Sequence, residues 1–273
     1  MWKLIKMDFY RLFSSKTIKI GMLMAGVVSV GYMLLSLGIV ALAKMTAAED
    51  PMANMGLELF LAQASWIYGV EFSQIVFGGT AVFSLFIGCM ISANFIGSEQ
   101  SCGYAKNYAG QLANKGCIAI SKFAVTSAMQ AVILAIYTLV CGIGAVILFG
   151  KYISAYDIGD LLAVLALRLM LHLAMNAIVI FICTFTKSHA IAMVAGCIFG
   201  LGITKFAYSA VEVLLGVMKI DFSISSYMPD GVNSQLALDR VGELAGRAIV
   251  VSIVFMALFT AANYLVLRKR DVK

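Results

Sequence analysis

The chain has 273 residues, of which 62% are hydrophobic and only 12% are charged, and its mean hydropathy is +0.96. A soluble domain needs a polar surface and carries about 25% charged residues. The composition therefore excludes a soluble enzyme or a soluble binding module, and the presence of only two prolines argues against long disordered linkers. We expect a polytopic membrane protein.

Residues 1–17 precede the first long apolar run and are predicted to form an amphipathic helix. Its basic residues Lys3, Lys6 and Arg11 lie opposite an apolar face made of Trp2, Ile5, Phe9, Leu12 and Phe13. A helix of this kind lies along a membrane interface. We expect it to anchor the first span; the alternative is that it passes motion from a cytoplasmic partner into the membrane.

Six membrane spans are predicted, because a helix needs roughly 20 apolar residues to cross a hydrocarbon core of about 30 Å. Between Asp160 and Lys187 the only charge in the fourth span is Arg168, and the fifth span contains Lys205. The runs lack the apolar and polar alternation of a transmembrane barrel, so the predicted fold class is all-α. The predicted spans are 20–43, 72–98, 120–149, 160–186, 189–216 and 247–267.

The distribution of positive charge predicts the orientation. With both termini in the cytoplasm, 13 of the 20 Lys and Arg residues fall in inner segments and only five in outer segments. Both termini are therefore predicted to be cytoplasmic, and the net charge of +6 indicates attraction to the inner leaflet rather than to nucleic acid. The six cysteines lie in predicted spans or in an inner loop and form no CxxC pair, so neither disulfides nor a metal site is expected.

The longest predicted inner loop follows the second span and runs from Glu99 to Lys122, with the coupling loop at 99–117. It is polar, contains Gly103, Gly110 and Gly116, and has room for one short helix. The chain has no glycine-rich phosphate loop, no HExxH pair, no GxSxG elbow and no catalytic cluster. We therefore expect neither an enzyme nor a resident cofactor, and we expect another chain to supply the energy for any work.

Two larger outer loops are predicted, at 44–71 and 217–246. In the first, residues 57–68 are expected to form another interfacial helix. In the second, Pro229-Asp230-Gly231 indicates a turn. Residues 234–246 are expected to form a helix that continues into the sixth span, because acids and bases recur there at four-residue spacing.

A polar stripe is predicted inside the fourth span. Arg168, His172 and Asn176 are four residues apart, so they share one helix face, at depths of roughly 12, 18 and 24 Å from the outer boundary. Either Arg168 snorkels outward while the other two bridge helices, or the stripe contacts substrate or gates a pathway. Lys205 and Glu212, near the outer rim of the fifth span, are further gating candidates, with snorkelling or pairing as the simpler interpretation.

Close packing of the fifth span is also predicted, because Gly196 and Gly200 form a GxxxG motif.

These features together resemble the permease subunits of type 2 ABC exporters, which include bacterial drug, lantibiotic-immunity and peptide-toxin exporters. The resemblance covers the topology of the whole chain. It rests on the basic amphipathic start at Trp2 to Phe13, on the long spans, and on the end of the second span at Phe95-Ile96-Gly97-Ser98-Glu99, followed by Gly103, Lys106 and Asn107. Ser98 and Cys102 depart from the pattern, because relatives often have larger or charged residues there.

The resemblance implies a coupling helix that docks on a separate cytoplasmic ATPase subunit, which would bind ATP and Mg²⁺. The residues matched to it are Glu99, Gly103, Tyr104, Lys106 and Asn107. It also implies a second permease copy or paralogue, re-entrant helices near 206–216 and 234–246, and a central pathway lined by the second and fifth spans.

The expected function is therefore ATP-driven export of a hydrophobic or amphipathic substrate across the bacterial cytoplasmic membrane, with a peptide toxin or antimicrobial peptide favoured. The alternative is a secondary transporter or channel, driven by an ion gradient, that uses the polar stripe of the fourth span.

Overall fold

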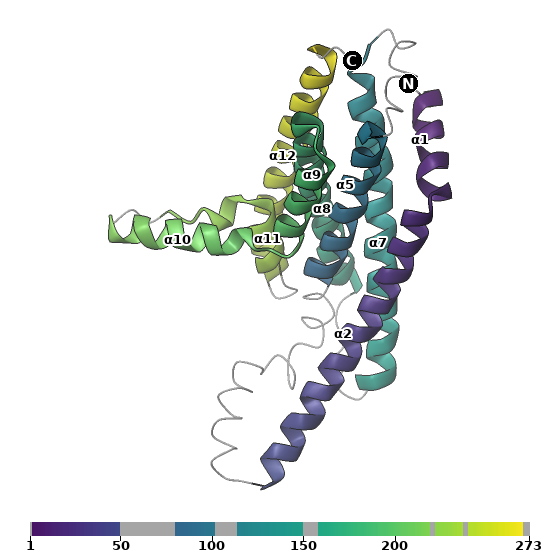
Figure 1. Cartoon of the computed structure of the whole chain (residues 1–273). Helices are drawn as coiled ribbons and strands as arrows, with labels where there is room; N and C mark the ends of the chain where they lie inside the picture. Colours follow the sequence, from purple (N-terminus) through teal and green to yellow (C-terminus); the bar gives the residue numbers. More distant parts are fainter. Residues whose placement is uncertain are drawn as a thin grey trace.

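The computed structural model describes residues 2–49, 80–101, 114–149, 158–218, 222–236 and 240–269, and within these ranges the chain is helical and has no strands. The predicted all-α fold class is confirmed. Most of the long helices run side by side, while α10 projects away from them (Figure 1). The described helices are α1 (Trp2–Ser14), α2 (Lys16–Glu49), the π-helical turn η2 (Thr80–Ser84), α5 (Leu85–Ser101), α7 (Cys117–Phe149), α8 (Ile158–Thr186), α9 (His189–Gly200), α10 (Thr204–Val217), the 3-10 turn η4 (Ser225–Tyr227), α11 (Pro229–Gln235) and α12 (Val241–Lys269).

Five of the described helices, α2, α5, α7, α8 and α12, contain segments long and apolar enough to cross a membrane. The pair α9 and α10 would make a sixth span, but the two helices meet at a bend of 65°. The 12 residues of α9 extend only about 18 Å, which is less than the hydrocarbon thickness of about 30 Å. The chain is a multi-pass membrane protein, and its predicted fifth span is not one straight helix.

The bend after α9 has a local cause. Gly202 adopts the left-handed conformation, with φ of +69°, directly after the cap residue Leu201. The Ile203 amide donates to the Ile198 carbonyl at 3.0 Å, and the Gly202 amide donates to the Phe199 carbonyl at 3.1 Å. This is the Schellman pattern that ends many helices. It stops α9 inside what reads in sequence as one continuous apolar run.

The boundaries of two other predicted elements also differ. Helix α2 continues to Glu49, beyond the predicted end at residue 43. The predicted helix at 234–246 is interrupted, because α11 ends at Gln235 and Leu236 is extended. Pro229 occupies the first helical position of α11, so the Pro-Asp-Gly sequence begins a helix instead of making the predicted turn. The interfacial helix expected at 57–68 lies outside the described residues.

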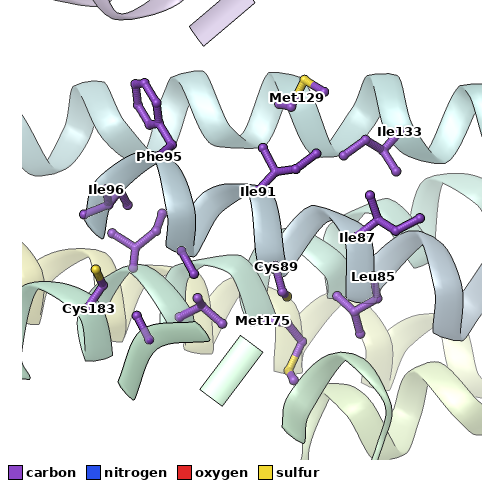
Figure 2. Packing of buried hydrophobic residues seen from close by; sticks show 14 of the residues in the cluster. Leu85, Ile87, Cys89, Ile91, Phe95, Ile96, Met129, Ile133, Met175 and Cys183 are labelled. Atoms are coloured by element: carbon purple, nitrogen blue, oxygen red, sulfur yellow. The ribbon is translucent and has the colours of Figure 1, made fainter. Parts of the chain in front are cut away.

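Helix α5 lies at the centre of the main core. About 67% of the segment Val82–Glu99 is buried within the chain, compared with 17% of the segment Val241–Lys269 in α12. Its buried side chains pack between Met129 and Ile133 of α7 and Met175 and Cys183 of α8 (Figure 2). A helix packed on several sides in a dense core cannot shift without moving its neighbours.

Helix α1 is present where an amphipathic helix was predicted, but its packed face is different. The buried residues are Leu4, Asp8 and Leu12, which are spaced by one helical turn. Ile5 and Phe9 pack against the core as expected, whereas Trp2 is 77% exposed and Phe13 is 38% exposed. Helix α1 runs beside the N-terminal part of α7. The C-terminal part of α12 lies at the same end of the bundle (Figure 1). We call this end of the bundle the termini end.

The two glycines of the GxxxG motif differ in how closely they approach α5. A Cβ at Gly200 would overlap backbone of Phe86, whereas a Cβ at Gly196 would make an ordinary 3.5 Å contact with Cys89. We expect Gly200→Ala to lower the free energy of unfolding by about 1–3 kcal/mol. The matched Gly196→Ala should change it by less than about 0.5 kcal/mol. Thermal unfolding in detergent measures both, and equal losses would contradict the expected difference.

Candidate functional site

Four charged residues from three helices, three of them buried and the fourth partly exposed, form a group at the termini end that we call the charge cluster. They are Asp8 and Arg11 of α1, Glu99 of α5 and Lys122 of α7. Lys122 Nζ lies 2.7 Å from Asp8 Oδ1 and 2.5 Å from Glu99 Oε2, and Arg11 Nη2 donates to Glu99 Oε2 at 3.1 Å. Asp8, Glu99 and Lys122 are each no more than 4% exposed. The charge cluster therefore joins α1, α5 and α7.

Further contacts compensate these buried charges. Ser121 Oγ donates to Asp8 Oδ2 at 2.7 Å. The Arg11 guanidinium and the Lys122 ammonium both lie 4.9 Å from the centroid of the Phe95 ring, so each makes a cation–π contact. A buried ion pair is tolerated only where good geometry and added hydrogen bonds offset the loss of hydration. The charge cluster contains two acids and two bases, so its formal charges balance.

The position of Glu99 explains why it needs cations. Glu99 lies in the last turn of α5, which ends at Ser101. The C-terminal end of a helix carries partial negative charge, so a carboxylate there is unfavourable by itself. Arg11 and Lys122 supply positive charge at this point, and they come from the helices that flank α5 at the termini end.

The far end of the predicted coupling loop is attached to α12. Asn114 Nδ2 donates to Tyr264 Oη at 2.5 Å, and Asn114 Oδ1 accepts the amide hydrogen of Gly116 at 2.9 Å. A Cβ at Gly116 would overlap the Tyr264 ring, so the chain approaches α12 closely here. Residues 102–113 thus connect two anchored points, one held by α1 and α7 and the other by α12.

The structure places one of the predicted coupling residues. Glu99 lies in the charge cluster, whereas Gly103, Tyr104, Lys106 and Asn107 lie outside the described residues. Sequence reasoning missed Asp8, Lys122 and Asn114 as members of this region. For Asp8 a signal was present, because an acid lies one turn from both Leu4 and Leu12 on the packed face of an amphipathic helix.

The polar stripe of α8 is buried and contacts α7. Gln130 Nε2 lies 3.1 Å from His172 Nδ1 and also donates to the Ser84 carbonyl of η2 at 3.2 Å. Asn176 Nδ2 donates to Thr126 Oγ1 at 2.9 Å. These contacts tie α7, α8 and η2 together, and they match the interpretation in which His172 and Asn176 bridge helices.

Arg168 does not snorkel outward, which differs from the first of the two interpretations of the polar stripe. It is only 2% exposed, and its Nη2 donates to the Leu236 carbonyl at 3.0 Å. Leu236 ends α11 and packs in a second core cluster with residues of α8 and α12. Arg168 therefore helps to hold the short helix α11 against α8.

Lys205 and Glu212 both lie on α10, away from the contacts of the polar stripe. Glu212 Oε1 accepts the Ser225 amide hydrogen at 2.8 Å and the Ser223 hydroxyl hydrogen at 3.2 Å. Thr204, at the start of α10, forms a hydrogen bond with Asp230. These contacts fasten α10 to the segment between α10 and α12, which includes α11. The stripe joins α8 to α7 and to the end of α11.

Among the residues that the structure describes, no group of three His, Cys, Asp or Glu side chains is placed to hold a metal ion. The contacts that the described residues make here are buried ion pairs at the Glu99 end of the loop and a side-chain hydrogen bond from Asn114 to Tyr264 at the other end. No protein-family model matches this chain, and no curated protein matches it.

Proposed function

We propose that this chain is the membrane-spanning subunit of an ATP-driven exporter whose energy comes from a separate cytoplasmic ATPase subunit. The observation that supports this proposal best is the anchoring of residues 99–116 at both ends. Buried ion pairs attach one end to α1 and α7, and Asn114 attaches the other end to α12. A short loop held in this way passes a displacement to several packed helices together.

In the proposed cycle, the ATPase binds the loop. The residues that it contacts are Gly103, Tyr104, Lys106 and Asn107. ATP binding closes the ATPase subunits and moves the loop. Glu99 moves with the loop, and α5 tilts because Glu99 is part of the last turn of α5. Since α5 lies at the centre of the core, its tilt rearranges the neighbouring helices and opens the pathway to the outside.

The proposal places both termini, and therefore the loop, on the cytoplasmic side where ATP is available. A second permease copy or paralogue completes the pathway. The substrate is hydrophobic or amphipathic, with a peptide toxin or antimicrobial peptide favoured, because the helices available to line a pathway are strongly apolar. The membrane is the cytoplasmic membrane of a bacterium.

The experiment that tests the proposal is affinity purification of the tagged chain in mild detergent. We expect an ATPase polypeptide to copurify, and we expect Lys106→Glu to weaken the association while Lys19→Glu, an exposed base at the start of α2, does not. Nucleotide turnover by the isolated chain would overturn the proposal. So would transport by the isolated chain in liposomes with a pH gradient and no ATPase.

An ion-gradient transporter remains the second candidate because the polar stripe of α8 is buried within the bundle. The exporter proposal makes the stripe structural. We therefore expect His172→Leu and Asn176→Leu each to lower stability by about 1 kcal/mol and to keep transport by the folded complex within about twofold. Transport assays on protein of measured thermal stability decide between the two. Loss of transport without loss of stability would favour the ion gradient.

A further inference from the structure

Helix α10 has its polar side covered and its apolar side exposed. Thr204, Tyr208 and Glu212 follow one another at four-residue spacing and are each only partly exposed. Thr204 and Glu212 form hydrogen bonds with the segment 223–230. On the other side, Phe206 is 79% exposed and Val217 is 78% exposed. A surface helix of a soluble protein has the opposite arrangement, so the exposed side of α10 is not built to face water.

The exposed side of α10 is also uncharged. The two charged residues of this helix, Lys205 and Glu212, are both only partly exposed. Among the nine exposed residues of α10, a helix that is described throughout, Ser209 is the only one with a polar side chain. Large exposed apolar surfaces mark contacts with lipid or with another protein.

The length of α9 indicates the depth at which α10 begins. Helix α9 starts at the termini end, because a Cβ at Gly97, two residues before Glu99, would overlap the His189 ring. Its 12 residues extend about 18 Å, which leaves roughly 12 Å of a hydrocarbon core of about 30 Å. The chain then bends by 65° and α10 projects from the bundle (Figure 1). Helix α10 therefore begins in the leaflet opposite the termini end.

The exposed side of α10 continues the lipid-facing side of α9. Helix α9 packs on α5 through the side that contains Gly196 and Gly200, so its opposite side faces away from the bundle. Exposed apolar side chains on that opposite side continue through the bend, with Ile198 and Leu201 followed by Ile203 and Phe206. The two helices thus present one continuous apolar surface.

The size of this surface favours lipid over a second copy of the chain. The 14 residues of α10 make a helix about 21 Å long and about 10 Å wide, so its exposed side offers on the order of 400 Å². Specific protein interfaces bury about 800 Å² on each partner. A second copy seated on α10 alone would be held weakly, whereas contact with acyl chains needs no minimum area.

We propose that the exposed side of α10 is covered by acyl chains of the leaflet opposite the termini end. Phe206, Val213 and Val217 contact these chains, and α10 is a partly inserted helix and not the second half of a straight span. Because Thr204 bonds to Asp230, the lipid contact also fixes the depth of α11. This contact does not depend on the proposed export function.

The test uses the full-length chain, with its ATPase if one copurifies, in liposomes of phosphatidylethanolamine and phosphatidylglycerol. Three variants carry the photoreactive residue benzoylphenylalanine in place of Phe206, Val217 or Tyr208, and mass spectrometry identifies what each captures under illumination. Tyr208 is the matched control, because it has a similar ring and lies on the covered side. We expect phospholipid adducts at Phe206 and Val217 and at least about fivefold less at Tyr208, since capture requires contact within about 4.5 Å.

The alternative occupants give different products. A covalent dimer as the main product at Phe206 and Val217 would show a second copy on this side and overturn the proposal. Equal lipid adducts at all three positions would overturn it too, as would the lack of lipid adducts at Phe206 and Val217. Thermal unfolding checks that each variant is folded, and Val217 serves if the variant at Phe206 is not.

Discussion

Lys122→Met is expected to lower the free energy of unfolding by about 3–5 kcal/mol, because it removes one partner of a buried ion pair and leaves the other charged. Asp8 is fully buried and Lys122 is its ion-pair partner at 2.7 Å. Glu99 would keep Arg11 at 3.1 Å. Methionine matches the length of the lysine stem, so the loss reports mainly on charge and not on packing. Chemical or thermal unfolding in detergent measures it.

Two further variants make this prediction specific. Lys19→Met removes an exposed base of α2 and should change stability by no more than about 0.5 kcal/mol. The double variant Asp8→Asn with Lys122→Met also removes the stranded acid, so it should recover about 1–3 kcal/mol of the loss. A single Lys122→Met variant as stable as Lys19→Met would contradict the burial and pairing of this lysine.

The long helices could be predicted from the sequence because the length of an apolar run is a local property. The runs that predicted four of the spans correspond to α2, α5, α7 and α8, and the last run corresponds to α12. The end of α9 could not be read in the same way. Glycine is common inside membrane spans, so Gly202 resembles a packing residue until its left-handed conformation is known.

The candidate site was only partly predictable. Glu99 was identified from its place at the end of the second span, but its partners depend on how the chain folds back. Arg11 is 88 residues from Glu99, and Asp8 is 114 residues from Lys122. Nothing local to Lys122 shows that it faces inward instead of toward lipid headgroups. Only the packing of α1 on α7 brings these charges together.

In the proposed exporter, neutralising Glu99 is expected to uncouple the ATPase from transport. In Glu99→Gln the amide keeps the shape of the side chain but loses the ion pairs to Arg11 and Lys122, so movement of the loop no longer reaches α1 and α7 with the same force. Coupling free energies of 1–3 kcal/mol correspond to factors of about 5–150. We expect the number of substrate molecules transported per ATP hydrolysed to decrease by a factor of this size. The measurement is transport and ATP hydrolysis by the reconstituted complex in the same vesicles.

The controls separate coupling from folding and from assembly. Glu99→Asp retains the charge and should restore part of the transport per ATP. Glu243→Gln removes an acid from the first turn of α12, at the opposite end of that helix from Tyr264, and should leave the ratio unchanged. Because the ATPase docks on residues 103–107 in our proposal, Glu99→Gln should still copurify with it. Normal transport per ATP in Glu99→Gln, in a complex that assembles normally, would show that the force passes through Asn114 and α12 and not through the charge cluster.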